Sequence, residues 1–218
     1  MGSGRVFSST TKVVVFAAAI AAMVVSVGAP ARAATTVNLV KNGGAEASTG
    51  THIPGWTHTT GTTLAAAKYG SANGFPTKSS PGPAHRGKNF FTGGKDSQFS
   101  NEVIVQTISL SKYVAKIKGG HVTMKVSGFF GGVASQKDNA GLDVLFKDGG
   151  GMILGSDTTI GLVTPAQRHN VTGLLYRSAT VTVPKSARSI YLDLFLDRID
   201  GDYNNGYADN ISVTLSGV

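Results

Sequence analysis

The stretch from Asp200 to Ser212, DGDYNNGYADNIS, holds the side chains of this sequence best suited to bind a cation. It contains three aspartates, three asparagines and two glycines in thirteen residues. Calcium takes oxygen ligands of this kind from loops. An EF-hand starting at Asp200 would need glycine at its sixth position and glutamate at its twelfth, where this sequence has Asn205 and Ile211. The residues from Asp200 to Gly206 therefore predict a polar turn before the last strand, not an EF-hand.

A second group of residues has the chemistry of a carbohydrate site, which needs aromatic faces for stacking and a few polar groups for hydroxyls. Alternation over Ser189–Asp197 predicts a strand with one apolar face and one mixed aromatic and acidic face. One open alternative is that a second sheet or a long loop covers the mixed face. For Trp56, the only tryptophan, the alternative is a structural role in which it covers the edge of the core. The candidate ligand-binding residues are Tyr191, Asp193, Phe195 and Asp197 on the strand, Tyr203 and Tyr207 in the loop after it, and Trp56.

Catalytic chemistry has little support in the sequence, and no catalytic residue is predicted. A glycosidase needs two carboxylates about 5–10 Å apart. Asp193 and Asp197 share a face, but four residues along a strand separate their Cα atoms by about 13 Å. The chain has no cysteine nucleophile, no G-x-S-x-G elbow and no HExxH helix.

The first 33 residues have the pattern of a secretory signal peptide. Arg5 and Lys12 form a basic start, residues 13–28 are almost all apolar, and Ala31 and Ala33 are the small residues before a predicted cleavage. The apolar run is shorter than the roughly 20 residues that a spanning helix needs. We therefore expect a secreted, extracellular protein with a single domain over residues 34–218 and no membrane span.

Charge and cysteine content restrict the partners of that domain. Removing the leader leaves 17 basic and 12 acidic residues, a net charge of about +5. The lysines are scattered, whereas nucleic-acid binding calls for a basic stripe with interleaved aromatics, so no nucleic-acid partner is predicted. Attraction to an anionic cell wall or matrix stays open. Without disulfides, the domain must rely on its core and on any bound metal.

The elements that must position these residues are strands. Period-two alternation recurs over 102–110, 121–129, 142–146 and 189–197, with turn residues between the segments. Further strands are expected at 37–41, 152–154, 174–183 and 211–215, and a short helical turn at 111–117. About nine strands without βαβ alternation predict an all-β fold, an antiparallel β-sandwich or barrel.

The two ends of the predicted domain carry a family likeness. Residues 38–46 read NLVKNGGAE, residues 53–56 read IPGW, and residues 206–215 read GYADNISVTL. These motifs resemble the opening and closing strands of the galactose-binding-like jelly roll found in carbohydrate-binding modules and in plant cell-wall proteins of the DUF642 type. The middle, from Phe129 to Ala140, is similar to secreted actinobacterial proteins of unassigned role. The usual aromatic residue before the glutamate is replaced by Ala45.

The resemblance implies a structural calcium between the first and last strands. Its carboxylate positions fall on Glu46 and Asp209, and main-chain carbonyls would complete the site. The alternative is that Glu46 is a solvated loop charge and that Asp209 binds its own turn.

Three functions follow as hypotheses. The first is a non-catalytic binding module, with polysaccharide or another glycan as the ligand that the resemblance implies. The second is a cell-surface or matrix protein that binds protein partners. The third is a secreted hydrolase with an unusual site, for which two close carboxylates in a cleft would be the sign.

Overall fold

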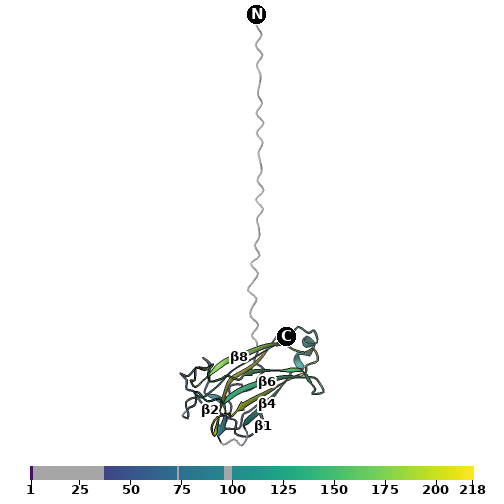
Figure 1. The fold of residues 1–218 in the computed structure, drawn as a ribbon. Coiled ribbons are helices and arrows are strands. Elements are labelled where there is room, and N and C mark those ends of the chain that lie inside the picture. The colour runs from purple at the N-terminus through teal and green to yellow at the C-terminus, as the bar shows by residue number, and fades with distance from the viewer. Residues whose placement is uncertain (2–36, 73, 96–99) are drawn as a thin grey trace. The chain divides into compact units, whose positions relative to one another are not determined.

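Two antiparallel sheets of five strands each form the body of the protein (Figure 1). This computed structural model describes residues 1, 37–72, 74–95 and 100–218, so the predicted signal peptide lies outside the described residues except for Met1. One sheet has the order β1-β4-β9-β6-β7 and consists of Thr57–Thr60, Asn101–Ser109, Ser189–Asp197, Asn139–Lys147 and Ile153–Gly161. The other has the order β2-β3-β10-β5-β8 and consists of Ala65–Lys68, Asn89–Lys95, Tyr203–Ser216, Thr123–Gly132 and Gly173–Thr182. The fold is an all-β antiparallel sandwich of the jelly-roll type, as the alternation and the resemblance predict.

Side-chain alternation explains why β4 and β9 form strands with one buried face. In β9 the side chains of Ile190, Leu192, Leu194 and Leu196 are all fully buried, while the residues between them are partly exposed. The same rule holds along β4, where every second residue is buried. Both assignments confirm the period-two prediction, because successive side chains of a strand point to opposite faces of the sheet.

Several predicted elements need correction. Residues 37–41 form no strand, although Leu39 donates its backbone N–H to the Val213 carbonyl at 2.8 Å. The Asn38 side chain takes over part of the pairing there, because its Oδ1 accepts the amide of Val213. β1, β2 and β3 are strands that were not among those expected from the sequence. The predicted helical turn is present as a 3-10 turn at Ser111–Tyr113 followed by α1, Val114–Lys118.

The outer faces of the two sheets differ in how they are covered. Phe90 of β3 and Tyr207 of β10 point away from the main core, yet both are fully buried. Tyr69 and Phe75 pack on them from the segment between β2 and β3. That segment therefore covers part of the outer face of the second sheet. On the first sheet, the outward side chains of β9 remain partly exposed.

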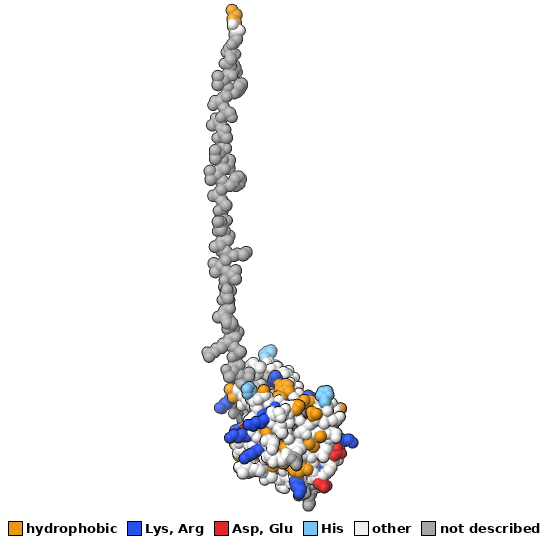
Figure 2. Space-filling view, turned by 90° about the vertical axis from the view of Figure 1, so that its left-hand side faces the viewer, with side chains coloured by type: hydrophobic (Ala, Val, Ile, Leu, Met, Phe, Trp, Pro, Cys, Tyr) orange, Lys and Arg blue, Asp and Glu red, His pale blue; other side chains and the backbone are white. Residues whose placement is uncertain are grey.

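The surface shows separate small apolar groups rather than one large patch in the view of Figure 2, with basic side chains at several places between them. The exposed large apolar residues include Met152, Ile153, Leu162 and Tyr176. Single exposed apolar side chains are ordinary on soluble domains and indicate no particular partner. Within the described residues, no helix is long and apolar enough to cross a membrane.

Candidate functional site: the β9 face and the junction of the two ends

We call the outward side of β9 and its two neighbours, β4 and β6, the β9 face. It contains four of the seven predicted ligand-binding residues in one row along the strand. Across the sheet, Tyr191 lies between Thr107 and Leu145, and Asp193 lies between Val105 and Asp143. Each of these four β9 side chains is partly exposed, so solvent reaches the whole row. The alternative in which a sheet or loop buries this face does not hold for the described residues.

The two aromatic rings of the β9 face are held by specific neighbours. The Phe195 ring lies over Gly141 of β6, because a Cβ atom added to Gly141 would overlap the ring. The ammonium of Lys147 lies 3.8 Å from the centroid of the Tyr191 ring. Gly141 thus leaves room for the Phe195 ring, and the Lys147 ammonium makes a cation–π contact with the Tyr191 ring, so both rings have a defined orientation. The row therefore presents two positioned aromatic side chains, separated by Asp193.

The carboxylates of the β9 face lie in an unusual electrostatic environment. Burial raises the pKa of Asp193 to about 6, and the nearby charge of Asp143 adds to the rise. Burial also raises the pKa of Asp197, against the effect of the hydrogen bond that Asn101 Nδ2 donates to its Oδ1 at 2.7 Å. Asp143 accepts a hydrogen bond from Thr159 Oγ1 at 2.6 Å. Asp193 therefore keeps its proton to a higher pH than an ordinary aspartate does.

Asp143 is the residue of this face that sequence reasoning missed. The alternation of Leu142, Val144 and Phe146 already places it outward, but only the pairing of β6 with β9 brings it opposite Asp193. Strand order in a sandwich is set by long-range packing and cannot be read from local alternation. The distance argument for Asp193 and Asp197 along one strand therefore overlooked a closer carboxylate on the next strand.

The other three predicted ligand-binding residues lie away from the β9 face. Trp56 is only 8% exposed, packs edge-on against Phe91 and donates its indole N–H to the Lys41 carbonyl at 3.1 Å. This matches the structural alternative for the lone tryptophan. Tyr207 is fully buried between Phe90 and Phe75.

Tyr203 and Tyr207 were expected in a loop after β9, but both belong to β10 in the other sheet. Tyr203 is partly exposed beside Phe75 and lines a small surface pocket with Ala72 and Asn205. The chain crosses to the second sheet within residues 198–202, so proximity in sequence to β9 does not bring these tyrosines to its outer face.

The loop between β9 and β10 is organised by aspartates that bind main-chain amides. Asp138, fully buried, accepts the N–H groups of Ile199 and Asp200 through Oδ1 and that of Asn205 through Oδ2. Asp200 itself accepts the amide of Lys137 at 2.7 Å. These contacts confirm a polar turn over residues 198–202, where carboxylates that accept main-chain amides stabilise the turn without any ion. The predicted turn was too long, because β10 already begins at Tyr203.

The first and last segments of the described chain meet beside Asp209. The N–H of Ile211 donates to the Gly43 carbonyl at 2.8 Å, which places the turn before Glu46 next to β10. The register of β10 against β5 shifts between Asp209 and Ser212, and Asn210 has a φ of 51°. Such a bulge re-aims side chains locally. The Asp209 side chain is fully buried there.

Both predicted metal ligands already hold hydrogen bonds. Asp209 Oδ2 accepts the Tyr69 hydroxyl at 2.6 Å, and its Oδ1 accepts the Asn210 amide at 2.7 Å. Glu46 Oε1 accepts the backbone N–H groups of Lys88 and Asn89 at 2.9 and 2.8 Å. Each carboxylate keeps lone pairs beyond these bonds, since an ionised carboxylate has about four acceptor sites.

The electrostatics at this junction show that the charge of Glu46 acts on Asp209. Burial raises the pKa of Asp209 to about 7, and the charge of Glu46 contributes to the rise. The Tyr69 and Asn210 hydrogen bonds and the charge of Arg86 act in the opposite direction. Burial and the Asp209 carboxylate together raise the pKa of the Tyr69 hydroxyl far above its usual range.

The donor set at the junction is compatible with calcium. A Cβ atom on Gly44 would lie 3.2 Å from both Asp209 Oδ1 and Asn210 Oδ1, so two side-chain oxygens converge on the space that glycine leaves open. Among the described residues no group of three or more His, Cys, Asp or Glu side chains gathers, so any cation would also need amide or main-chain oxygens. Mixed carboxylate and carbonyl oxygen sets are what calcium accepts.

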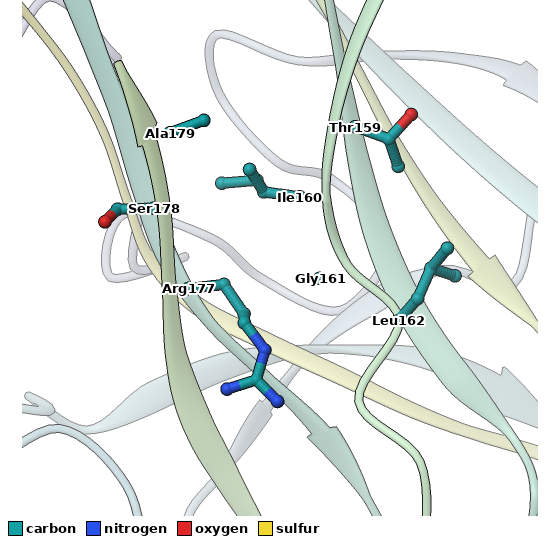
Figure 3. Close-up of a pocket in the computed structure, with 7 residues that line it drawn as sticks. All are labelled: Thr159, Ile160, Gly161, Leu162, Arg177, Ser178 and Ala179. Atoms are coloured by element: carbon teal, nitrogen blue, oxygen red, sulfur yellow. The ribbon is translucent and has the colours of Figure 1, made fainter.

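A pocket of a different kind opens between the edge strands β7 and β8 of the two sheets. Figure 3 shows the Arg177 side chain extending from its own strand, β8, into the space that separates this strand from Ile160 and Leu162. Arg177 donates to the Gln167 side chain at 3.1 Å. The lining residues include no carboxylate and no histidine, so this pocket offers no acid–base chemistry.

Comparisons with known proteins define the architecture. No protein-family model and no curated protein matches the chain. Among solved structures, it is similar to the enzymatically active domain of tailspike protein 4 of bacteriophage CBA120, with 13% identity and a TM-score of 0.53 over 82% of this chain. The chain spans only 21% of that tailspike chain.

A cyclase from Fischerella sp. TAU is similar over 84% of this chain and 99% of its own, with 12% identity and a TM-score of 0.51. A family 16 carbohydrate-binding module matches at 15% identity over 81% of this chain and 99% of its own, with a TM-score of 0.48. A TM-score below 0.5 is too low to show a shared fold. At these identities the likenesses show the jelly-roll sandwich fold alone, so function must be argued from the site.

Proposed function

We propose that this protein is a secreted, non-catalytic carbohydrate-binding protein that binds its glycan on the β9 face and holds a structural calcium ion at the junction of its two ends. The observation that carries the proposal is the row of Tyr191, Asp193, Phe195 and Asp197, which stays partly exposed on an uncovered sheet. Sugar rings are bound by aromatic faces together with a few polar groups placed to read hydroxyls.

The contrast with the other sheet supports this choice of surface. There the outward aromatic side chains Phe90 and Tyr207 are buried beneath Tyr69 and Phe75. On the β9 face, by contrast, the Phe195 ring lies on Gly141 and the Tyr191 ring contacts the Lys147 ammonium, and both aromatic side chains remain partly exposed to solvent. Aromatic residues that are held in place but uncovered lose little entropy when a ligand stacks on them.

Calcium is proposed from the donor chemistry at the junction. The Asp209 carboxylate and the Asn210 side-chain oxygen converge beside Gly44, and Glu46 lies close enough for its charge to raise the pKa of Asp209. A cation bound there would offset that repulsion and join residues near both ends of the domain. Secretion is proposed from the leader-like pattern of residues 1–33, and the likeness to DUF642-type and actinobacterial proteins stays a prediction.

A glycan array probed with the purified protein in calcium-containing buffer tests the binding role. We expect binding to a restricted set of glycans, with loss of the signal in the double variant Tyr191→Ala, Phe195→Ala. Tyr176→Ala is the matched control, because this exposed aromatic residue lies on β8 in the other sheet. A blank array for the folded protein would refute carbohydrate binding and favour a protein partner at the cell surface or in the matrix.

A second candidate function, hydrolysis of a glycan, is favoured by the pairing of Asp143 with Asp193. Directly opposite residues in an antiparallel pair have Cβ atoms about 5 Å apart. Retaining glycosidases need two carboxyl groups about 5–5.5 Å apart, one of which keeps a raised pKa as the acid. Reducing ends released from a bound glycan, and lost in Asp193→Asn, would establish this activity. Binding without release would leave the non-catalytic role.

A further inference from the structure

The β9 face carries a row of negative charge through its centre. Asp143 and Asp193 are cross-strand partners between β6 and β9, and Asp197 follows four residues later on the same side of β9. Like charges directly opposite one another destabilise a sheet. A ligand that neutralises them would therefore recover free energy that the empty protein does not have.

No basic side chain of the described residues is among the groups that lower the pKa of Asp193 or Asp197. The pKa of Asp193 is raised by burial and by Asp143, and no lysine or arginine lowers it. The pKa of Asp197 is likewise raised by burial and by Asp143, opposed only by the Asn101 hydrogen bond. Lys147, the lysine nearest along β6, has its ammonium 3.8 Å from the Tyr191 ring centroid. Asp193 and Asp197 are therefore the carboxylates of the row with which a cationic ligand would pair.

The side-chain atoms beside Asp197 that lack a hydrogen-bond partner are acceptors, as carboxylate oxygens are. Asn101 and Asn139 lie on either side of Asp197 across the sheet. The Asn101 Nδ2 group donates a hydrogen bond to Asp197, and the Asn139 Nδ2 group donates one to the Lys137 carbonyl. The Oδ1 atoms of both asparagines are buried and have no hydrogen-bond partner. An unmade hydrogen bond at a buried acceptor costs free energy. The polar atoms around Asp197 therefore include two acceptors without a donor, in addition to the negative charge of the row.

The aromatic rings define where such a donor would be placed. Tyr191 and Phe195 lie two residues to either side of Asp193 on the same face, about 7 Å along the strand. A sugar ring stacked on either side chain would bring its substituents next to the carboxylate pair. An ammonium group has three donors, no acceptor and a positive charge, and it forms charge-assisted hydrogen bonds with carboxylates.

We propose that the β9 face selects glycans whose sugars carry free, positively charged amino groups, such as polymers of glucosamine, over neutral, N-acetylated or uronic-acid glycans. The inference rests on the proposed carbohydrate-binding function and specifies its ligand class. N-acetylation removes the charge that pairs with Asp143 and Asp193, and a uronic acid would place another negative charge against them. Charge complementarity of this kind determines which partner binds.

Titration calorimetry with matched oligosaccharides of equal length tests the selectivity. The probes are oligomers of glucosamine, of N-acetylglucosamine, of glucose and of galacturonic acid. We expect the glucosamine oligomer to bind at least about tenfold more tightly than the N-acetylated one, the size of one charge-assisted hydrogen bond. That advantage should shrink when the salt concentration rises from about 0.05 M to about 0.5 M, since exposed charges are screened.

Isosteric variants assign the preference to the carboxylate pair. Asp143→Asn and Asp193→Asn should each reduce the glucosamine advantage by about tenfold or abolish it, and both relieve repulsion, so folding is retained. Asp148→Asn is the matched control, because it removes the same charge from the turn after β6 while keeping the Oδ1 that accepts the amides of Gly150 and Met152. The control should keep the full preference.

The outcomes separate the inference from the proposed function. Binding of neutral or N-acetylated oligomers as tightly as glucosamine oligomers would refute the amino-sugar preference and leave carbohydrate binding intact. An unchanged preference in both Asn variants would refute the role of the carboxylate pair. Binding of none of the four oligomers and of no glycan on the array would refute the proposed function, and the preference with it.

Discussion

Removing calcium is the perturbation that tests the junction of the two ends most fully. If the ion binds at Glu46 and Asp209, it binds the folded protein and not the unfolded chain, where these residues are more than 160 positions apart. Binding to the folded state alone stabilises it by about 2.7 kcal/mol when free calcium is 100 times its dissociation constant. For a domain of this size each kcal/mol raises the melting temperature by roughly 2–4 °C, so chelation should lower it by about 5–10 °C.

Differential scanning calorimetry in calcium and in excess chelator measures that shift. Glu46→Gln and Asp209→Asn keep the shape of each side chain and remove its charge, and either variant should melt at one temperature in both buffers. Asp202→Asn, in the exposed loop before β10, is the charge-matched control and should keep the full shift. Equal melting of the unmodified protein in both buffers, or an undiminished shift in the two variants, would refute calcium binding here.

Three further predictions follow from the described contacts. Asp193 is protonated in the folded state up to about pH 6 but in the unfolded chain only to about pH 4. The free energy of unfolding, measured by urea titration, should therefore fall as the pH rises from about 4 to about 6. The Asp193→Asn variant should lack this pH dependence. Gly141→Ala should displace the Phe195 ring and weaken glycan binding by about tenfold while leaving the fold intact; unchanged affinity in calorimetry would contradict the placement of that ring. Arg168→Ala should lower the free energy of unfolding in urea by at least about 3 kcal/mol, because the buried guanidinium donates to four main-chain carbonyls. A decrease below about 1 kcal/mol would show that these carbonyls find other hydrogen-bond donors.

Local alternation was enough to predict the strands that pack one face against the core. β9 was predicted with its bounds and its buried leucines, because leucine or isoleucine at every second position leaves one orientation for the strand. β1 and β2 were missed because neither presents such a row: they are four-residue edge strands without a fully buried side chain.

The sites depended more on long-range contacts than the strands did. The approach of Glu46 to Asp209 was inferred from a family likeness, and the structure adds Tyr69, which no sequence pattern connects to Asp209. The β9 row was visible in the sequence, whereas its partner Asp143 required the order of strands in the sheet. Tyr203 and Tyr207 were assigned to the wrong surroundings because a few residues are enough for the chain to cross between sheets.

Binding of a glycan identified on the array, measured by calorimetry in single aromatic variants, tests the central claim most directly. A sugar ring covering about half of an aromatic side chain removes roughly 80 Å² of apolar surface from water, which corresponds to about 2 kcal/mol or about thirtyfold in affinity. Phe195→Ala and Tyr191→Ala should each weaken binding by that order, and Tyr176→Ala on the other sheet should leave it unchanged. Equal affinity in all three variants, or a loss confined to Tyr176→Ala, would contradict binding on the β9 face.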